Sequence, residues 1–179
     1  MDNVRIFAGS ASKELAQKVC NRLNLPLGEV ELTYFGDGEF QRQFMENIRG
    51  CDIFIICSTH SPLENYWELF QMIDAARWAS ANKIIVVMPY YGYARQDRKD
   101  KPRVSVTSKL AAKFLQTAGA SRIVLVDIHV DQILGYFDIP CDQVYASNIY
   151  IDYIKSSHAD LNIVVASPDS GGTRRAHIS

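Results

Sequence analysis

Positive charge is concentrated between Arg95 and Arg103, in a chain whose charges otherwise balance. This run holds five basic and two acidic side chains within nine residues, whereas the 179-residue chain has a formal net charge of −1. Arg95 and Gln96 open the run. A guanidinium can clamp phosphate oxygens in bidentate fashion, and an amide can hydrogen-bond a base or a hydroxyl. The pair therefore suits a nucleotide, although a charge run can also be a solvated surface loop.

Three tyrosines lie directly before the basic run, within residues 89–93. A strand that ends in an aromatic and basic loop is a common way to build a ligand site on an open α/β sheet. The rings of Tyr90, Tyr91 and Tyr93 could stack on a base, and they could equally be packing or interface residues. The sequence leaves both alternatives open.

Acidic side chains and one histidine follow another apolar segment, residues 122–126. Asp127 and His129 are two residues apart at the end of a predicted strand, so they share one face, and Asp138 and Asp142 follow. Carboxylates with one imidazole and no thiol suit a hard ion such as Mg²⁺, which keeps waters and binds substrate phosphates. A histidine at a strand end can also be a hydrogen-bonded structural residue.

Two glycine-containing segments add candidate ligand loops. In "FGDGEF" the glycines permit a tight turn, and Asp37 and Glu39 are acceptors for ribose hydroxyls or adenine amines, although such a turn often just joins two elements. In "SPDSGG" a predicted strand leads through Asp169 to a helix start, where free N–H groups favour an anion. This second segment could also be a plain strand-to-helix connection.

Short β-branched runs that alternate with helical patterns should position these loops. The predicted strands are residues 4–9, 29–35, 52–59, 83–89, 122–129 and 162–169. Several are apolar on both faces, as a covered parallel sheet requires. The alternation predicts an α/β fold with a largely parallel sheet flanked by helices, and open sheets of this kind bind ligands at the carboxyl ends of their strands.

Two helices are predicted from their apolar stripes. The first lies within residues 62–81, and its apolar positions are Tyr66, Leu69, Phe70, Ile73 and Ala76. The second lies within residues 108–120, and its apolar positions are Leu110, Ala111, Phe114 and Leu115. Gly119 suits the end of the second helix, because glycine adopts the left-handed conformation of a helix C-terminus without strain.

Composition narrows the classes of partner. The near-zero net charge argues against nucleic acid. The N-terminus has no signal-peptide pattern and no apolar run is long enough to span a bilayer, so we expect no membrane partner. The four cysteines, at positions 20, 51, 57 and 141, lack zinc-ligand spacing, which favours free thiols in a reducing cytoplasm.

Taken together, these segments resemble the ribose-phosphate diphosphokinases, also called phosphoribosyl pyrophosphate synthetases. The resemblance covers essentially the whole chain, and its most specific part is "GYARQDRKD" combined with "DIHVDQILGYFDIP". It implies a magnesium-dependent transfer of the terminal diphosphoryl group of ATP to ribose 5-phosphate, giving phosphoribosyl pyrophosphate and AMP for nucleotide biosynthesis. It also implies phosphoribosyltransferase-like domains and a homo-oligomer, a hexamer built from dimers.

The resemblance carries over residue by residue. The residues that match the family's ATP-contacting positions are Asp37, Gly38, Glu39, Arg95 and Gln96. The first three belong to a loop that reaches the adenine across a subunit boundary. The residues that match its magnesium-site positions are His129 and Asp169, with Asp127, Asp138 and Asp142 as further acidic contributors.

The resemblance also divides the chain. It implies an N-terminal ATP-binding domain at residues 1–146 and the truncated beginning of a second, similar domain at residues 147–179. We expect the family's flexible catalytic loop and its ribose-phosphate loop beyond Ser179, so no catalytic residue is assigned here and the chain alone should be inactive. The alternative is a noncatalytic regulatory homologue that assembles with active subunits. The presence of Arg95, Gln96, His129 and Asp169 favours the enzyme.

Overall fold

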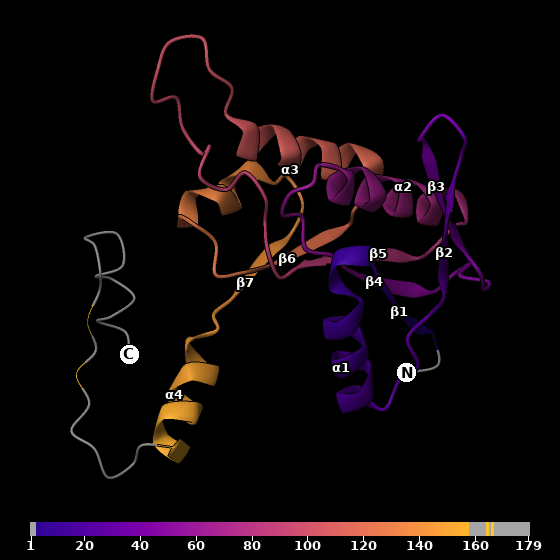
Figure 1. The fold of residues 1–179 in the computed structure, drawn as a ribbon, viewed down its shortest axis with the longest axis horizontal. Coiled ribbons are helices and arrows are strands. Elements are labelled where there is room, and N and C mark those ends of the chain that lie inside the picture. The colour runs from indigo at the N-terminus through magenta and orange to yellow at the C-terminus, as the bar shows by residue number, and fades with distance from the viewer. Residues whose placement is uncertain (1–2, 158–163, 165, 167–179) are drawn as a thin grey trace. The chain divides into compact units, whose positions relative to one another are not determined.

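A computed structural model describes residues 3–157, 164 and 166. The chain divides into two compact units, Met1–Val144 and Tyr145–Ser179. The first unit has a five-stranded sheet, helices on both of its faces and a separate two-stranded hairpin (Figure 1). The second contains α4 (Ser147–Ser157). The predicted α/β class is confirmed, whereas the assignment of the second unit to another phosphoribosyltransferase-like domain stays a prediction.

The main sheet is parallel throughout, with strand order β1-β4-β5-β6-β7. Its strands are β1 (Val4–Ala8), β4 (Asp52–Ile56), β5 (Lys83–Met88), β6 (Arg122–Val126) and β7 (Cys141–Val144). The first four coincide with predicted strands, and β7 was not predicted. The predicted strand at residues 162–169 lies, apart from residues 164 and 166, outside the described residues.

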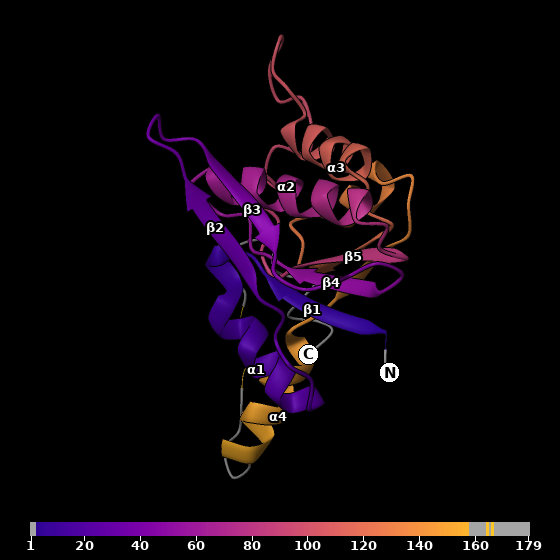
Figure 2. The same ribbon diagram turned by 90° about the vertical axis from the view of Figure 1, so that its right-hand side faces the viewer.

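The two faces of the main sheet enter two separate cores, because neighbouring side chains along a strand point to opposite sides. Phe7 packs in the larger core under α2 (Glu64–Trp78) and α3 (Thr107–Ala118). Its neighbours Ile6 and Ala8 pack in the smaller core under α1 (Lys13–Leu23), a helix that sequence reasoning had not predicted. Figure 2 shows α2 and α3 on one side of the sheet and α1 on the other.

The apolar side chains predicted on the two helices are buried to different extents. On α2, Tyr66, Leu69, Ile73 and Ala76 are buried and Phe70 is partly buried, as expected. On α3 the prediction is half right: two of its four apolar side chains are buried, whereas Leu110 is 42% and Phe114 50% exposed. The exposed pair faces a groove between the two helices rather than the sheet. Gly119 ends α3 as predicted, with a φ of 123°.

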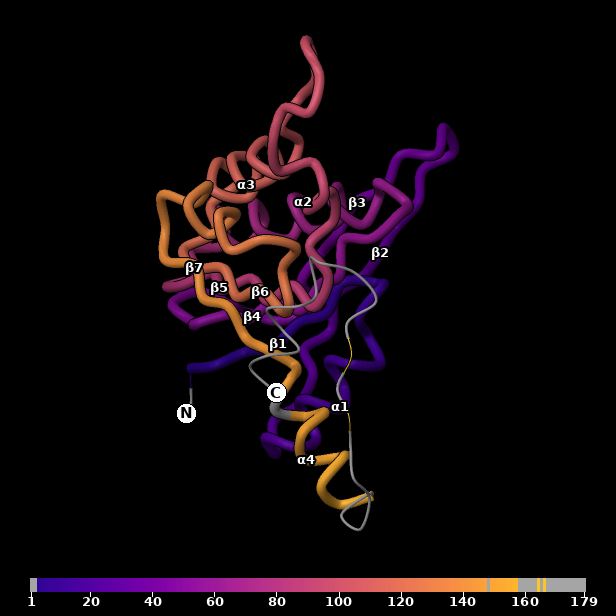
Figure 3. Tube along the Cα trace, turned by 90° about the vertical axis from the view of Figure 1, so that its left-hand side faces the viewer, coloured from indigo at the N-terminus to yellow at the C-terminus, as the bar shows by residue number. Residues whose placement is uncertain are grey.

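The hairpin is formed by β2 (Val30–Tyr34) and β3 (Phe40–Phe44), which pair antiparallel. The strand predicted at residues 29–35 exists, but it lies outside the main sheet. Residues 35–39 are therefore the tip of a hairpin and not a loop at the carboxyl edge of the main sheet. Figure 3 shows this hairpin extending away from the sheet.

Two short 3₁₀ helices complete the first unit, η1 (Ser10–Ser12) after β1 and η2 (Asp131–Tyr136) between β6 and β7. Each occupies the loop at the carboxyl end of a main-sheet strand, so each borders the edge where ligands bind in open α/β sheets. No helix among the described residues is both long enough and apolar enough to cross a membrane.

Candidate nucleotide and metal site

The aromatic turn after β5 mixes packing residues with exposed ones. Tyr91 is 4% exposed, and its hydroxyl donates to the carbonyl of Ser108 at 2.7 Å. Burial raises the pKa of the Tyr91 hydroxyl, so this ring stays a neutral packing residue. Tyr90 and Tyr93 are 51% and 43% exposed. Of the two alternatives left open by the sequence, packing holds for Tyr91, while the other two rings remain available to a ligand.

Arg95 and Gln96 are exposed and follow directly on this turn. The turn holds their backbone, since the Gln96 amide donates to the carbonyl of Tyr93 at 2.9 Å and the Gln96 carbonyl accepts from the amide of Ser108 at 3.2 Å. Their side chains lie at the surface while the chain beneath them is fixed. This arrangement suits a pair that binds a ligand from solvent.

Asp97 is buried, unlike every other charged residue of the basic run. Its carboxylate accepts a hydrogen bond from Gln132, and its backbone carbonyl accepts one from the hydroxyl of Tyr136. Both partners belong to η2, which follows the Asp127–His129 segment. Asp97 thus joins the two candidate ligand loops. Sequence reasoning missed this role, because an aspartate inside a charge run gives no sign of burial.

Asp127 and His129 stand at the carboxyl end of β6, beside the loop after β5. Both are exposed, and Ile128 between them is buried. The Asp127 amide donates to the carbonyl of Val144 at 3.1 Å, and its φ of 44° is in the left-handed region. Non-glycine residues with such backbone angles cluster at functional sites.

Two further predicted metal contributors, Asp138 and Asp142, are not brought to this edge. Asp142 lies within β7 and forms an ion pair with Arg122, the first residue of β6. Asp138 also lies away from Asp127. Its amide donates to Gln116 Oε1 at 2.6 Å, and Gln116 is near the C-terminal end of α3, which lies away from the carboxyl edge of the sheet. Asp169 lies outside the described residues.

The donor chemistry at the end of β6 fits a magnesium ion that is shared with a substrate. Among the described residues, no three His, Cys, Asp or Glu side chains gather closely enough to hold a metal by themselves. Magnesium often uses one or two carboxylates, several waters and substrate phosphate oxygens. Asp127 and His129 could supply the protein side of such a site.

The hairpin tip presents the third candidate group. Asp37 Oδ1 accepts from the amide of Glu39 at 3.1 Å, and the Phe35 amide donates to the carbonyl of Glu39 at 2.8 Å. Gly38 has a φ of 93°, which favours glycine. The carboxylates of Asp37 and Glu39 are exposed beside a cavity of about 470 Å³. This cavity is lined by residues 37–40, Trp67 and Gln71.

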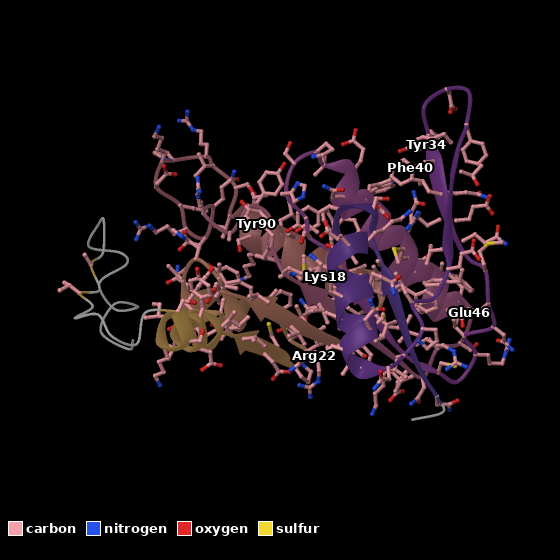
Figure 4. The ribbon with its side chains drawn as sticks, turned by 60° about the horizontal axis from the view of Figure 1, so that its bottom comes forward. Lys18, Arg22, Tyr34, Phe40, Glu46 and Tyr90 are labelled. Atoms are coloured by element: carbon pink, nitrogen blue, oxygen red, sulfur yellow. The ribbon has the colours of Figure 1, made fainter. Side chains whose placement is uncertain are left out.

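The hairpin tip and the basic loop stand apart in Figures 1, 2 and 3. Figure 4 shows Tyr34 and Phe40 next to each other near the tip, with their ring centroids 5.8 Å apart, and Glu46 at the other end of the hairpin. The hairpin tip and the basic loop are therefore separate projections of a single chain.

Residues 4–119 match a family model described as the N-terminal domain of ribose phosphate pyrophosphokinase. The chain belongs to the ribose-phosphate pyrophosphokinase family. A ribose-phosphate pyrophosphokinase of Porphyromonas gingivalis is 49% identical over 98% of this chain, and one of Chlorobaculum tepidum is 51% identical over 97%. The matches cover 56% and 54% of those two proteins, so the chain spans about half the length of these curated relatives.

A solved structure shows the same fold. The crystal structure of phosphoribosylpyrophosphate synthetase from Mycobacterium smegmatis superposes with a TM-score of 0.92 at 42% identity. The match covers 98% of this chain and 59% of that one. The family and fold inferred from the sequence motifs are thereby confirmed, while the individual site residues stay predictions.

Proposed function

We propose that this chain supplies the ATP- and magnesium-binding part of a ribose-phosphate pyrophosphokinase, which makes phosphoribosyl pyrophosphate and AMP from ATP and ribose 5-phosphate. One observation carries the proposal: the loops with Arg95 and with His129 leave neighbouring parallel strands at their carboxyl ends, and Asp97 hydrogen-bonds one loop to the other. Open α/β sheets bind ligands at such an edge. Family membership supports the same assignment.

The proposed roles follow from the demands of the reaction. Attack on the β-phosphorus places negative charge on phosphate oxygens, so the enzyme must supply positioning and positive charge more than a strong base. Arg95 would bind phosphate oxygens and Gln96 a base or hydroxyl, while Asp127 and His129 would hold magnesium, with Asp169 as a further ligand. Magnesium, when bound, would neutralise charge on the phosphate oxygens.

We also propose that Asp37, Gly38 and Glu39 of another copy of the chain complete the adenine end of the site. The separation of the hairpin tip from the basic loop within one chain supports this arrangement. Self-association is further supported by an open apolar groove of about 960 Å³ between α2 and α3. Trp67 and Phe114 line this groove and are 60% and 50% exposed, which is unusual for side chains of their size.

The cysteines bear on the proposed cellular compartment. All four are free thiols, of which Cys20, Cys51 and Cys57 are buried and Cys141 is partly buried. Thiols persist in reducing compartments, whereas oxidising ones favour disulfides. We therefore propose a cytoplasmic location.

A titration of the purified chain with ATP, with and without Mg²⁺, tests the proposed function. We expect weak, magnesium-dependent binding that Arg95→Ala weakens by about tenfold, because a bidentate phosphate contact is lost. Arg22→Ala is the matched control, since Arg22 is an exposed arginine on α1, away from the site. Figure 4 labels Arg22 on that helix.

The same titration separates the enzyme from the noncatalytic alternative. A regulatory homologue that has lost its site would not bind ATP in a magnesium-dependent manner, and that result would contradict our proposal. A coupled assay for AMP completes the test. Production of AMP that depends on ribose 5-phosphate by this chain alone would contradict the expectation that the catalytic loop belongs to the rest of the protein.

A further inference from the structure

A buried ion pair joins the hairpin to α2. Arg42 Nη2 lies 2.9 Å from Glu68 Oε1, and the two side chains are 1% and 5% exposed. Arg42 is the central residue of β3, and Glu68 lies in the first half of α2. The same guanidinium nitrogen donates to the carbonyl of Ala8 at 3.3 Å, at the end of β1. The pair therefore ties the hairpin to both a helix and the main sheet.

Glu68 extends this link to the loop after β1. Its Oε1 also accepts from the amide of Ser10 at 2.8 Å and from the hydroxyl of Ser10 at 3.1 Å. Arg42 is less well satisfied, because its buried Nε and Nη1 atoms find no hydrogen-bond partner among the described residues. Buried ion pairs are often no more stabilising than apolar residues of similar size, so stability alone is a weak reason for this one.

Gln71, one turn further along α2, holds the backbone of β3. Its Nε2 donates to the carbonyl of Phe40 at 2.9 Å, and its Oε1 accepts from the amide of Arg42 at 3.0 Å. The amide side chain thus binds the edge of β3 as a neighbouring strand would. Glu68 and Gln71 are three residues apart and lie on the same side of the helix. We call Arg42, Glu68 and Gln71 the hairpin clamp.

The clamp acts close to the tip. Phe40 follows directly on the loop that contains Asp37 and Glu39, Arg42 is two residues further along β3, and Gln71 lines the cavity beside that loop. At the opposite end of the hairpin, Arg5 and Glu46 form an ion pair at 3.2 Å with side chains 35% and 37% exposed. That contact lies at the base of the hairpin, whereas the clamp lies nearer to the tip.

We propose that Arg42, Glu68 and Gln71 are positioning residues that fix the tilt of the hairpin against α2 and thereby set where Asp37 and Glu39 meet the nucleotide. The nucleotide part rests on the proposed function. The tilt of the hairpin is independent of the proposed function, because it can be measured without a ligand.

The first experiment separates positioning from stability through three variants, Arg42→Met, Glu68→Gln and the double variant. Each single variant should lower Tm by roughly 10 °C, since it leaves a buried charge without its partner. The double variant should recover most of that loss, because both charges are gone and the glutamine can still accept from Ser10. It should still bind Mg²⁺–ATP about tenfold more weakly, because a displaced tip misplaces the contacts.

The second measurement reports the tilt without nucleotide. Trp67 borders the cavity beside the tip, and Trp78 is the other tryptophan of the chain. In a Trp78→Phe background, we expect the double variant to raise the acrylamide quenching of Trp67, because the hairpin no longer closes against α2. Gln71→Met should speed hydrogen exchange at the Arg42 amide by about tenfold or more, and it provides a test if the charge variants fold poorly.

Arg5→Met is the matched control, since it breaks an arginine–glutamate pair at the base of the hairpin that is partly exposed. It should leave Trp67 quenching and nucleotide affinity unchanged. The proposal is overturned if the double variant regains its Tm with parental quenching and parental affinity. If the parent chain does not bind Mg²⁺–ATP, the proposed function fails, and Trp67 quenching with Arg42 amide exchange then decides whether the clamp sets the tilt.

Discussion

Gly92 occupies a position in the aromatic turn where a side chain has no room. A Cβ atom there would lie 2.2 Å from the carbonyl oxygen of Thr59 and 2.9 Å from a ring carbon of Tyr66. Gly92 also accepts from the hydroxyl of Tyr66 at 2.8 Å and donates to Thr59 Oγ1 at 2.9 Å. The turn that carries Arg95 is therefore packed directly against the loop after β4 and against α2.

We expect Gly92→Ala to destabilise the protein by about 1–3 kcal/mol, the usual range for overpacking, because backbone atoms must move. Gly36→Ala is the control, since a Cβ atom at Gly36 would meet nothing within 4 Å. Urea denaturation measures both. Equal midpoints for the two variants would show that the turn accommodates a methyl group.

Buried thiols make stability depend on alkaline pH. Burial, with a contribution from Glu68, raises the pKa of Cys57 from 9.0 to about 12, and burial raises that of Cys141 to about 12. Below about pH 8 both thiols keep their protons in the folded and the unfolded chain. Between pH 9 and 12 the unfolded chain loses these protons while the folded chain retains them, so the free energy of unfolding falls.

We expect Tm to decrease from pH 9 upward, and Cys57→Ala to make that decrease shallower. Thermal unfolding at intervals between pH 7 and 11 measures the effect. Parent and variant should give parallel curves below pH 8, where no thiol titrates in either state. A variant curve parallel to the parent above pH 9 as well would show that Cys57 ionises equally in both states.

At the residue scale, the sequence predicted the location of the candidate site residues, but it did not predict the buried contacts around them. Arg95, Gln96 and His129 lie at the carboxyl edge of the sheet, because the topology of parallel strands dictates that position. The buried roles of Arg42 and Asp97 could not be predicted. Their partners are 26 and 35 residues away, and no local pattern records such a contact.

Helix α3 has two leucines in contrasting surroundings. Leu115 is fully buried against the main sheet, and Leu110 is 42% exposed in the groove beside α2. Leu115→Ala should lower the free energy of unfolding by about 2–5 kcal/mol, because it leaves a cavity. Leu110→Ala should lower the free energy of unfolding of the monomer by less than about 1 kcal/mol. Urea midpoints at low protein concentration compare the two, and similar losses would mean that the groove is closed in solution.

The elements that the sequence predicted are those with a strong internal pattern. Apolar runs identified β1, β4, β5 and β6, and apolar stripes identified α2 and α3. Strand β3, "FQRQF", escaped prediction because its three central residues are all polar, and its inward-facing position is an arginine whose partner is on a helix. Strand β7 is four residues long, too short for periodicity to be read.

At the scale of the whole molecule, the groove between α2 and α3 is the surface on which self-association can be tested. Phe114→Glu places a charge in the groove and should raise the dissociation constant of any homo-oligomer by about tenfold or more, because an interface core tolerates an unpaired charge poorly. Leu23→Glu is the control, since Leu23 is 53% exposed on α1. Sedimentation equilibrium measures both, and equal constants would place the interface elsewhere.

The arrangement of whole elements was predicted in part. Family motifs and strand alternation anticipated the parallel sheet, whereas the place of the hairpin depends on long-range pairing with α2 that no motif encodes. The site is divided accordingly. The proposed phosphate and metal residues lie at the sheet edge that strand order creates, and the proposed adenine residues lie on a hairpin that packs against α2.

The strand order has a consequence for how the chain folds. Strands β4, β5, β6 and β7 are neighbours both in sequence and in the sheet, but β1 pairs with β4 across 48 positions, from Val4 to Asp52. Closing that loop costs more chain entropy than closing the β4–α2–β5 crossover, which spans 31 positions from Asp52 to Lys83. We expect a nucleus at β4–α2–β5 and late docking of β1. Val86→Ala should then slow folding, and Phe7→Leu should mainly accelerate unfolding, as measured by φ-values.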